Sequence, residues 1–176
     1  IIKKVMVGGT DTFNFTGTPN GSISTDQGTI QMVVPTGSYA SIEGVKAGWD
    51  LTSIVCSDQN STGNLQNRTA NFNVESGEIV TCTFTNTKRG NIVIVKDVIG
   101  NPDPTDFTFT NNFGNGNPAS FMLDEDTNGD LPSSRTFAVL PGTYSVAETA
   151  LPHWQLESAT CDERSLVSAI SVAPGE

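Results

Sequence analysis

The side chains that could carry reactive chemistry are few: three cysteines and one histidine. A thiolate can act as a nucleophile or a metal ligand, and two thiols can form a disulfide. The single histidine, His153, leaves no multi-histidine metal site, and no nucleophile accompanies it in a spacing that general-base catalysis would need. We therefore expect no enzyme and expect Cys56, Cys82 and Cys161 to have structural roles.

A second group of candidate residues lies in the acidic segment DEDTNGD. Its side-chain oxygens are spaced like the ligands of a calcium loop; they belong to Asp124, Asp126, Asn128 and Asp130. Arg135 stands where an EF-hand would have its bidentate glutamate, and no helical pattern flanks the segment. The segment is interpreted as a solvated acidic turn, with weak calcium binding as the alternative. No other cofactor is expected.

Composition and charge narrow the class of protein. The 176 residues carry a formal charge of −10, which argues against nucleic-acid binding because a phosphate backbone requires a basic face. Only 16% of the residues are charged, and no run approaches the roughly 18 apolar residues of a membrane span. This balance is typical of a secreted or cell-surface β protein. The sequence starts at Ile1 in mid-pattern, so we interpret it as a processed piece of a longer exported protein.

An internal repeat defines the organisation of the chain. PTGSYASIE in the first half matches PGTYSVAE in the second, and GWDLTSIVC matches HWQLESATC. Three landmarks recur at one constant offset: Tyr39 as Tyr144, Trp49 as Trp154 and Cys56 as Cys161. The sequence therefore predicts two homologous domains, residues 1–88 and 89–176.

Both copies alternate apolar and polar residues over short segments bounded by Gly, Pro, Asn and Asp, which predicts all-β sandwich domains. The clearest strand, IVTCTFTNT, places Cys82, Phe84 and Asn86 on one face and threonines on the other. In an exported protein, Cys56 and Cys82 are expected to form a disulfide. Two buried free thiols are the alternative.

The second copy has no counterpart of this strand within the sequence. Gly77-Glu78 precedes the strand in the first copy, and the matching Gly175-Glu176 ends the second. Cys161, the equivalent of Cys56, then has its expected partner outside the sequence. A sheet that lacks its terminal strand exposes unpaired backbone groups. We therefore expect a following segment or a neighbouring subunit to supply the strand.

Several segments together resemble tandem prealbumin-like repeats, of the SpaA or CnaB type, in bacterial and archaeal surface proteins. These segments are GWDLTSIVCSD, GEIVTCTFTNTKRG, IVIVKD, DFTFT, FMLDED and RTFAVLPGTYSVAE. The resemblance covers essentially the whole chain. It implies seven-stranded, transthyretin/Ig-like β-sandwiches that serve as modules of a stalk, pilus or adhesin and are not enzymes.

The resemblance also implies an autocatalytic Lys–Asn isopeptide bond, which many relatives form with the help of a buried acid. The matching positions in the first copy are Lys3 or Lys4, Glu43 and Asn86. In the second copy they are Lys96 and Glu148, and the asparagine is absent. The chemistry needs a neutral amine and a protonated carboxyl, and burial favours both. The alternative is an ordinary hydrogen-bonded glutamate beside a surface lysine.

These observations predict a structural subunit or repeat of an extracellular surface filament, pilus or stalk whose partners are copies of itself. The alternative is an adhesin or carbohydrate-binding module that uses loop aromatics such as Phe113 and Trp154. Four Asn-x-Ser/Thr sequons in the first copy are candidates for glycosylation: Asn14, Asn20, Asn60 and Asn67.

Overall fold

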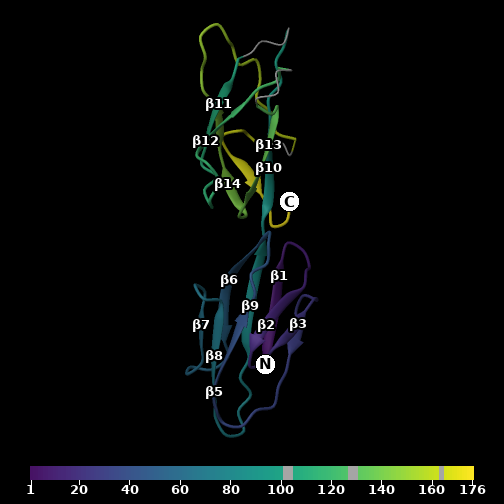
Figure 1. Ribbon diagram of the computed structural model, residues 1–176, viewed down its shortest axis with the longest axis vertical. Coiled ribbons are helices and arrows are strands. Elements are labelled where there is room, and N and C mark those ends of the chain that lie inside the picture. The colour runs from purple at the N-terminus through teal and green to yellow at the C-terminus, as the bar shows by residue number, and fades with distance from the viewer. Residues whose placement is uncertain (101–104, 127–130, 163–164) are drawn as a thin grey trace. The chain divides into compact units, whose positions relative to one another are not determined.

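The computed structural model describes residues 1–100, 105–126, 131–162 and 165–176 (Figure 1). These residues form strands, turns and loops, so the all-β class predicted from the alternating pattern is confirmed. The chain divides into two compact units, called unit 1 and unit 2 below, with main ranges Ile1–Arg89 and Gly90–Pro174. Within the described ranges, no helix has the length and apolar character needed to cross a membrane.

Unit 1 is a sandwich of two sheets. One sheet has the strand order β4-β1-β9-β6 and the other β3-β2-β5-β8-β7. The strands are β1 (Ile2–Val7), β2 (Phe13–Gly17), β3 (Gly21–Ile23), β4 (Thr29–Ile30), β5 (Gly37–Glu43), β6 (Trp49–Cys56), β7 (Thr62–Asn64), β8 (Thr69–Val74) and β9 (Cys82–Lys88). Unit 1 thus has nine strands, whereas the resemblance implied seven. Two of them, β3 and β4, are only three and two residues long.

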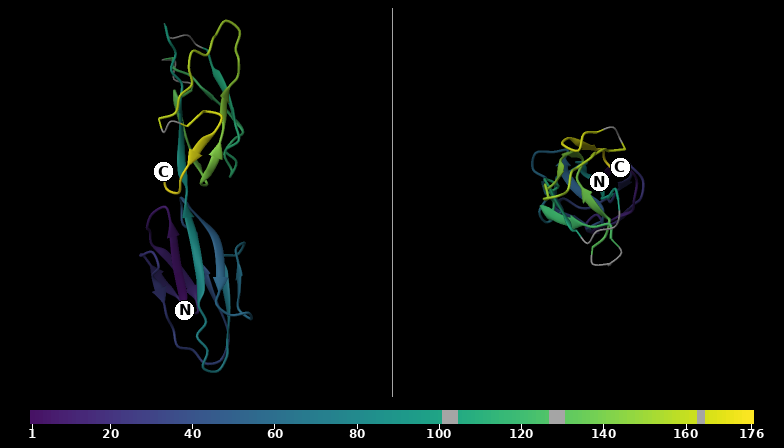
Figure 2. Two further views of the ribbon diagram at one scale, coloured as in Figure 1. Left: turned by 180° about the vertical axis from the view of Figure 1, so that it is seen from behind. Right: turned by 90° about the horizontal axis from the view of Figure 1, so that it is seen from above.

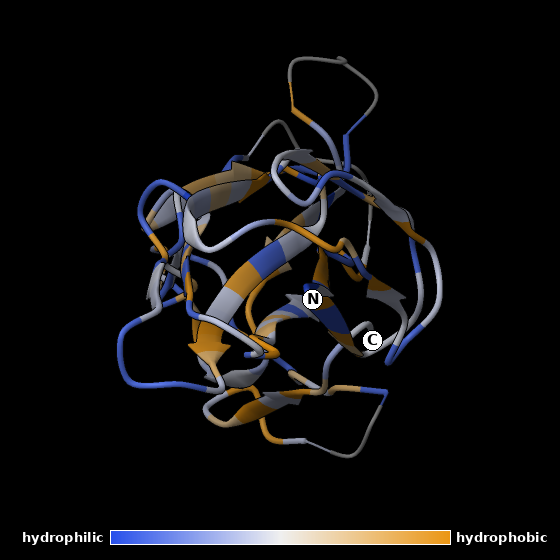
Figure 3. Ribbon diagram, turned by 90° about the horizontal axis from the view of Figure 1, so that it is seen from below, coloured by the Kyte–Doolittle hydropathy of each residue, from blue (hydrophilic) through white to orange (hydrophobic). Residues whose placement is uncertain are grey.

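The core of unit 1 forms because its strands turn alternate residues inward. Bands of contrasting hydropathy along the strands show this alternation (Figure 3). Two edge-to-face aromatic pairs join the sheets, with ring centroids 5.3 Å apart for Phe13 and Trp49 and 5.1 Å apart for Phe15 and Phe84. Each pair takes one ring from β2 and one from the opposite sheet, so the aromatic residues hold the two layers together.

β9 is an inner strand that runs parallel to β1 and antiparallel to β6. The views from the front and from behind both show it, in teal, within its sheet (Figures 1 and 2). Its inward residues Cys82, Phe84 and Asn86 are all 0% exposed. Cys82 lies directly opposite Cys56 of β6, and the two form the predicted disulfide. The last strand of unit 1 is therefore covalently bonded to its antiparallel neighbour.

Unit 2 has three smaller sheets, with orders β10-β13, β12-β11-β15 and β14-β16. The strands are β10 (Gly90–Val95), β11 (Phe107–Asn111), β12 (Ser120–Leu123), β13 (Ser134–Val139), β14 (Gly142–Tyr144), β15 (Val146–Glu148) and β16 (Ile170–Val172). One edge of β10 pairs with β13, and no strand among the described residues pairs along its other edge. In unit 1 the corresponding edge of β1 is occupied by β9.

Two aromatic residues named for the adhesin alternative lie in the core of unit 2 or pack against it. Phe113 is 1% exposed, and its ring centroid lies 4.9 Å from that of Phe137 and 6.0 Å from that of Tyr144. Trp154 is partly buried and packs edge-to-face on Phe107 with centroids 5.1 Å apart. Burial of large rings is a major source of core stability. The interpretation of Phe113 as an exposed binding residue is therefore wrong, whereas Trp154 remains partly exposed.

We expect the double variant Cys56→Ser, Cys82→Ser to lose about 3.5 kcal/mol of unfolding free energy in unit 1, because the disulfide restricts a loop of 26 residues in the unfolded chain. Urea denaturation measures this loss. Cys161→Ser is the matched control and should change stability by less than about 0.5 kcal/mol. Equal stability of the double variant and the parent chain would contradict the expectation.

Candidate functional site

Three strands of unit 1 bring one basic, one acidic and one amide side chain into the core. Lys4 comes from β1, Glu43 from the end of β5 and Asn86 from β9, and these residues are 0%, 1% and 0% exposed. Strand alternation turns Lys4 inward and leaves Lys3 partly exposed on the other face. Of the two lysines that the sequence left as candidates, Lys4 is therefore the one beside Glu43 and Asn86.

The three side chains contact one another directly. Lys4 Nζ lies 2.6 Å from Asn86 Oδ1 and 3.4 Å from Glu43 Oε2. Asn86 Nδ2 donates a hydrogen bond to Glu43 Oε1 at 2.9 Å. Lys4 Nζ also lies 4.2 Å from the centroid of the Phe13 ring, an arrangement that stabilises a cation. The carboxylate thus faces the amine with one oxygen and the amide nitrogen with the other.

An arginine that sequence reasoning missed completes this group. Arg68, in the turn before β8, has a φ of 57°, and its guanidinium pairs with Glu43 Oε1. Its Nε donates to the carbonyl of Glu43 at 3.0 Å, and its Nη2 donates to the carbonyl of Gly44 at 3.2 Å. Arg68 lies outside every strand, so the alternating pattern gave no sign that it reaches the core. We call Lys4, Glu43, Arg68 and Asn86 the buried cluster.

Burial changes the proton affinity of Lys4. Desolvation lowers the pKa of Lys4 from 10.5 to about 8, while Glu43 opposes this shift and Arg68 adds to it. About a tenth of the amine is then neutral at pH 7. Glu43 Oε2 makes no hydrogen bond among the described residues, although it is buried. A neutral amine held against a side-chain amide, with a carboxylate beside both, can act as a nucleophile toward the amide carbon.

Unit 2 holds a similar lysine–glutamate pair at the positions that the repeat predicted. Lys96 Nζ lies 3.0 Å from Glu148 Oε2 and 4.0 Å from the centroid of the Phe107 ring. The two side chains are 11% and 13% exposed, so they are more accessible than Lys4 and Glu43. The amine, carboxylate and ring of the buried cluster therefore recur in unit 2.

The predicted calcium segment is only partly described. Asp124 is buried, its Oδ1 accepts a hydrogen bond from the Asp126 N–H at 2.9 Å, and its Oδ2 makes none among the described residues. Asn128 and Asp130 lie outside the described residues. Within the part of the chain that the structure describes, no group of three or more His, Cys, Asp or Glu side chains could hold a metal ion. Weak calcium binding stays a prediction.

The remaining candidates lie at or near the surface. The four sequon asparagines are exposed, namely Asn14, Asn20, Asn60 and Asn67, and their glycosylation stays a prediction. Cys161 is partly exposed and forms no disulfide with the described cysteines. Desolvation and the neighbouring Asp162 raise the pKa of its thiol, which disfavours the reactive thiolate. His153 is exposed and has a φ of 71°.

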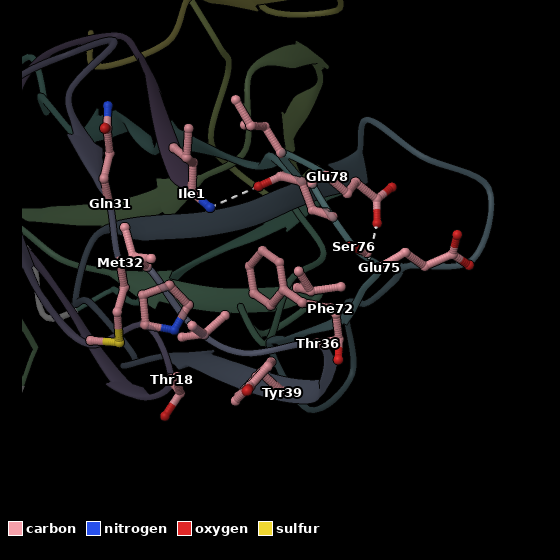
Figure 4. A pocket seen from close by; sticks show the side chains of 17 residues that line it. Ile1, Thr18, Gln31, Met32, Thr36, Tyr39, Phe72, Glu75, Ser76 and Glu78 are labelled. Carbon is pink, nitrogen blue, oxygen red and sulfur yellow. Dashed lines mark hydrogen bonds between the residues drawn. The ribbon is translucent and has the colours of Figure 1, made fainter.

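A separate hollow of about 580 Å³ opens on unit 1. Met32, Tyr39 and Phe72 line it, together with Ile1, whose amino group donates a hydrogen bond to the Val80 carbonyl at 2.7 Å (Figure 4). No member of the buried cluster lines this hollow. The chemistry of the cluster therefore concerns the chain itself and not a ligand held there.

Comparisons with known proteins identify the fold. A family model for the prealbumin-like fold domain, of the SpaA type, matches residues 1–88. Among solved structures, the chain is similar to a streptococcal ancillary pilin, with 16% sequence identity and a TM-score of 0.31. That match covers 99% of this chain and 58% of the pilin chain, so this chain spans less than two thirds of the pilin's length. No curated protein matches the sequence. The prealbumin-like fold expected from the repeated segments is confirmed by the family match.

In a chain carrying Asn86→Ser, we expect the contribution of Lys4 to the unfolding free energy to increase from pH 8 toward pH 10.5. The lowered pKa of Lys4 in the folded state means that the unfolded chain binds more protons in this window, so stability rises with pH. Urea denaturation at several pH values measures the slope. The chain that also carries Lys4→Met is the reference and should show a smaller slope. Parallel profiles for the two chains would refute the assignment.

Proposed function

Because the chain belongs to the prealbumin-like fold domain family, which its residues 1–88 match, we propose that its two units are structural modules of an extracellular surface filament, pilus or stalk. A strand from a following segment or a neighbouring subunit would complete unit 2 and link one module to the next. The observation that carries this proposal is a hydrogen bond from the Asn91 N–H to the Glu176 carbonyl, at 2.9 Å.

The chain reaches this hydrogen bond through a turn that both units contain. The Glu78 N–H donates to the Glu75 carbonyl in unit 1, and the Glu176 N–H donates to the Ala173 carbonyl in unit 2, both at 3.3 Å. The glycines that precede the two glutamates have φ values of 75° and 79°. Glu176 thus occupies the position of Glu78, from which the unit 1 chain continues into β9.

The hydrogen bond lies on the unpaired edge of β10. The Lys96 N–H donates to the Ser133 carbonyl at 2.8 Å, on the side of β13. Because successive N–H groups of a strand point to opposite edges, the odd-numbered residues of β10, Asn91 included, turn their N–H groups away from β13. The Glu176 carbonyl therefore makes a contact that a strand added to this edge would extend.

The register of the contact also matches unit 1. The Ile1 N–H donates to the Val80 carbonyl where β9 begins to pair with β1. Lys96 corresponds to Lys4, so Asn91 lies two residues before the position that corresponds to Ile1. Glu176 corresponds to Glu78, so it lies two residues before the position that corresponds to Val80. A parallel ladder repeats every two residues. A strand that continued this ladder would pair with β10 as β9 pairs with β1.

Within unit 1, we infer that the buried cluster forms an isopeptide bond between Lys4 Nζ and Asn86 Cγ. Nζ attacks Cγ, the Cγ–Nδ2 bond breaks, and Nδ2 leaves as ammonia. Glu43 accepts the proton that Nζ loses and returns one to Nδ2, because its two oxygens lie 3.4 Å and 2.9 Å from these nitrogens. The bond would join β1 to β9, through which the chain enters and leaves unit 1. Tension along a filament would then act on covalent bonds.

We expect the intact mass of the folded chain, measured after reduction, to be lower than the sequence mass by one ammonia. Lys4→Arg and Asn86→Ser should each restore the mass calculated for the variant, because the nucleophile or the amide is then lost. Lys3→Arg, one residue away on the outward face, is the matched control and should keep the deficit. A parent chain with the full sequence mass would contradict the isopeptide proposal and would not affect the filament proposal.

A synthetic peptide with the sequence of residues 79–88 is expected to bind the full chain at β10, since unit 1 already holds its own copy of that strand. Hydrogen exchange should slow at the Val93 and Val95 amides, which point to the unpaired edge. The same peptide with an aspartate in place of the Phe84 residue is the control and should bind more weakly. Unchanged exchange at both amides would argue against strand completion.

Electron microscopy of the native material tests the assembly itself, and filaments are the expected result. Discrete particles that bind a glycan at a defined site would favour the adhesin alternative instead. Phe113, one of the two aromatic residues named for that alternative, is buried in the core of unit 2.

A further inference from the structure

The buried cluster contains a cation that the isopeptide reaction does not consume. The guanidinium of Arg68 reaches both Glu43 Oε1 and the neighbouring backbone carbonyls. The Arg68 side chain is 19% exposed and that of Glu43 is 0% exposed, so Arg68 approaches the buried carboxyl from the surface. A guanidinium stays protonated and favours the ionised form of a carboxyl with which it pairs.

We propose that Arg68 is a positioning residue that orients the Glu43 carboxyl, with Oε1 toward Asn86 and Oε2 toward Lys4, and that its positive charge disfavours the protonated form of Lys4. This inference rests on the proposed isopeptide bond. Lys4 must first lose its proton to solvent, so the rate of bond formation rises with pH.

The charged groups that face Lys4 support this assignment. Glu43 and Asp26 favour the protonated amine and raise its pKa, and Arg68 disfavours it. Asp26 lies in the turn that precedes β4 and accepts a hydrogen bond from the Met6 N–H at 2.7 Å. Without Arg68, Lys4 would lose the cation that opposes the effect of Glu43 and Asp26. The amine would then keep its proton to a higher pH.

Every proton transferred in the reaction is accounted for without a proton from Arg68. The Lys4 Nζ–Asn86 Cγ bond forms, and the proton released by Nζ passes to Glu43 Oε2. The Glu43 carboxyl then gives up this same proton to Nδ2 as the Cγ–Nδ2 bond breaks and ammonia leaves. Glu43 ends in the protonation state in which it began, and the guanidinium exchanges no proton. Arg68 therefore acts through the orientation of Glu43 and through the positive charge that it places near Lys4.

The rate of bond formation against pH tests the proposal. The full chain, kept unfolded in denaturant, is diluted into refolding buffer at several pH values, quenched at intervals and weighed after reduction. For Arg68→Gln we expect the midpoint of the pH profile to move up by about one unit, which is about tenfold in rate at neutral pH. Arg89→Gln, which removes the partly exposed ion pair with Asp50, is the control and should leave the midpoint unchanged.

Arg68→Lys separates charge from shape. It keeps the cation and loses the forked contacts, so we expect a slower reaction with the midpoint of the parent chain. This variant also serves if Arg68→Gln fails to fold. A midpoint that moves upward in Arg68→Lys, or a uniform slowing of Arg68→Gln without any shift, would overturn the proposal.

A second readout does not depend on the covalent bond. In a chain carrying Asn86→Ser, carbon NMR of Lys4 Cε follows the titration of the amine directly. Adding Arg68→Gln should raise the pKa of Lys4, and an unchanged pKa would overturn the role of Arg68. If the parent chain forms no bond, the isopeptide proposal fails, and this titration still decides whether Arg68 controls the charge of Lys4.

Discussion

The structure of unit 1 depends on the burial of one face of β9. Cys82, Phe84 and Asn86 are all 0% exposed, and each meets a different kind of partner: a disulfide, an aromatic ring and an amine. A shift of one residue would turn the intervening threonines inward and all three side chains outward. The contacts are chemically distinct and cannot replace one another. Together they specify one register of β9 against both β1 and β6.

The polar end of that face explains why ionisable groups can be buried in a small sandwich. Removing charges from water is costly unless the groups satisfy one another. Lys4, Glu43 and Asn86 do so by direct contact, and Arg68 adds its charge from the partly exposed side. Unit 2 repeats the amine, the carboxylate and the ring, but its pair is more exposed.

Much of this organisation could be predicted from the sequence, and the errors have physical causes. Tyr39, Trp49 and Cys56 recur at one offset because homologous strands keep their core positions. Strand alternation could not choose between Lys3 and Lys4, since adjacent residues face opposite sides and either phase was open until β1 was paired. Phe113 looked like a loop residue, but a loop that folds back over a sheet buries its rings as effectively as a strand does.

The sequence by itself determined the repeat and the all-β class, because these follow from spacing along the chain, and it led us to expect the Cys56–Cys82 disulfide that the structure contains. Only the tertiary structure decided that Lys4 and not Lys3 enters the core, that Arg68 reaches Glu43, and that the Glu176 carbonyl accepts a hydrogen bond from Asn91 of β10. These are contacts between segments distant in the chain, and their existence depends on which strand edges meet. A pattern in one segment carries no information about which side chain of another segment will face it.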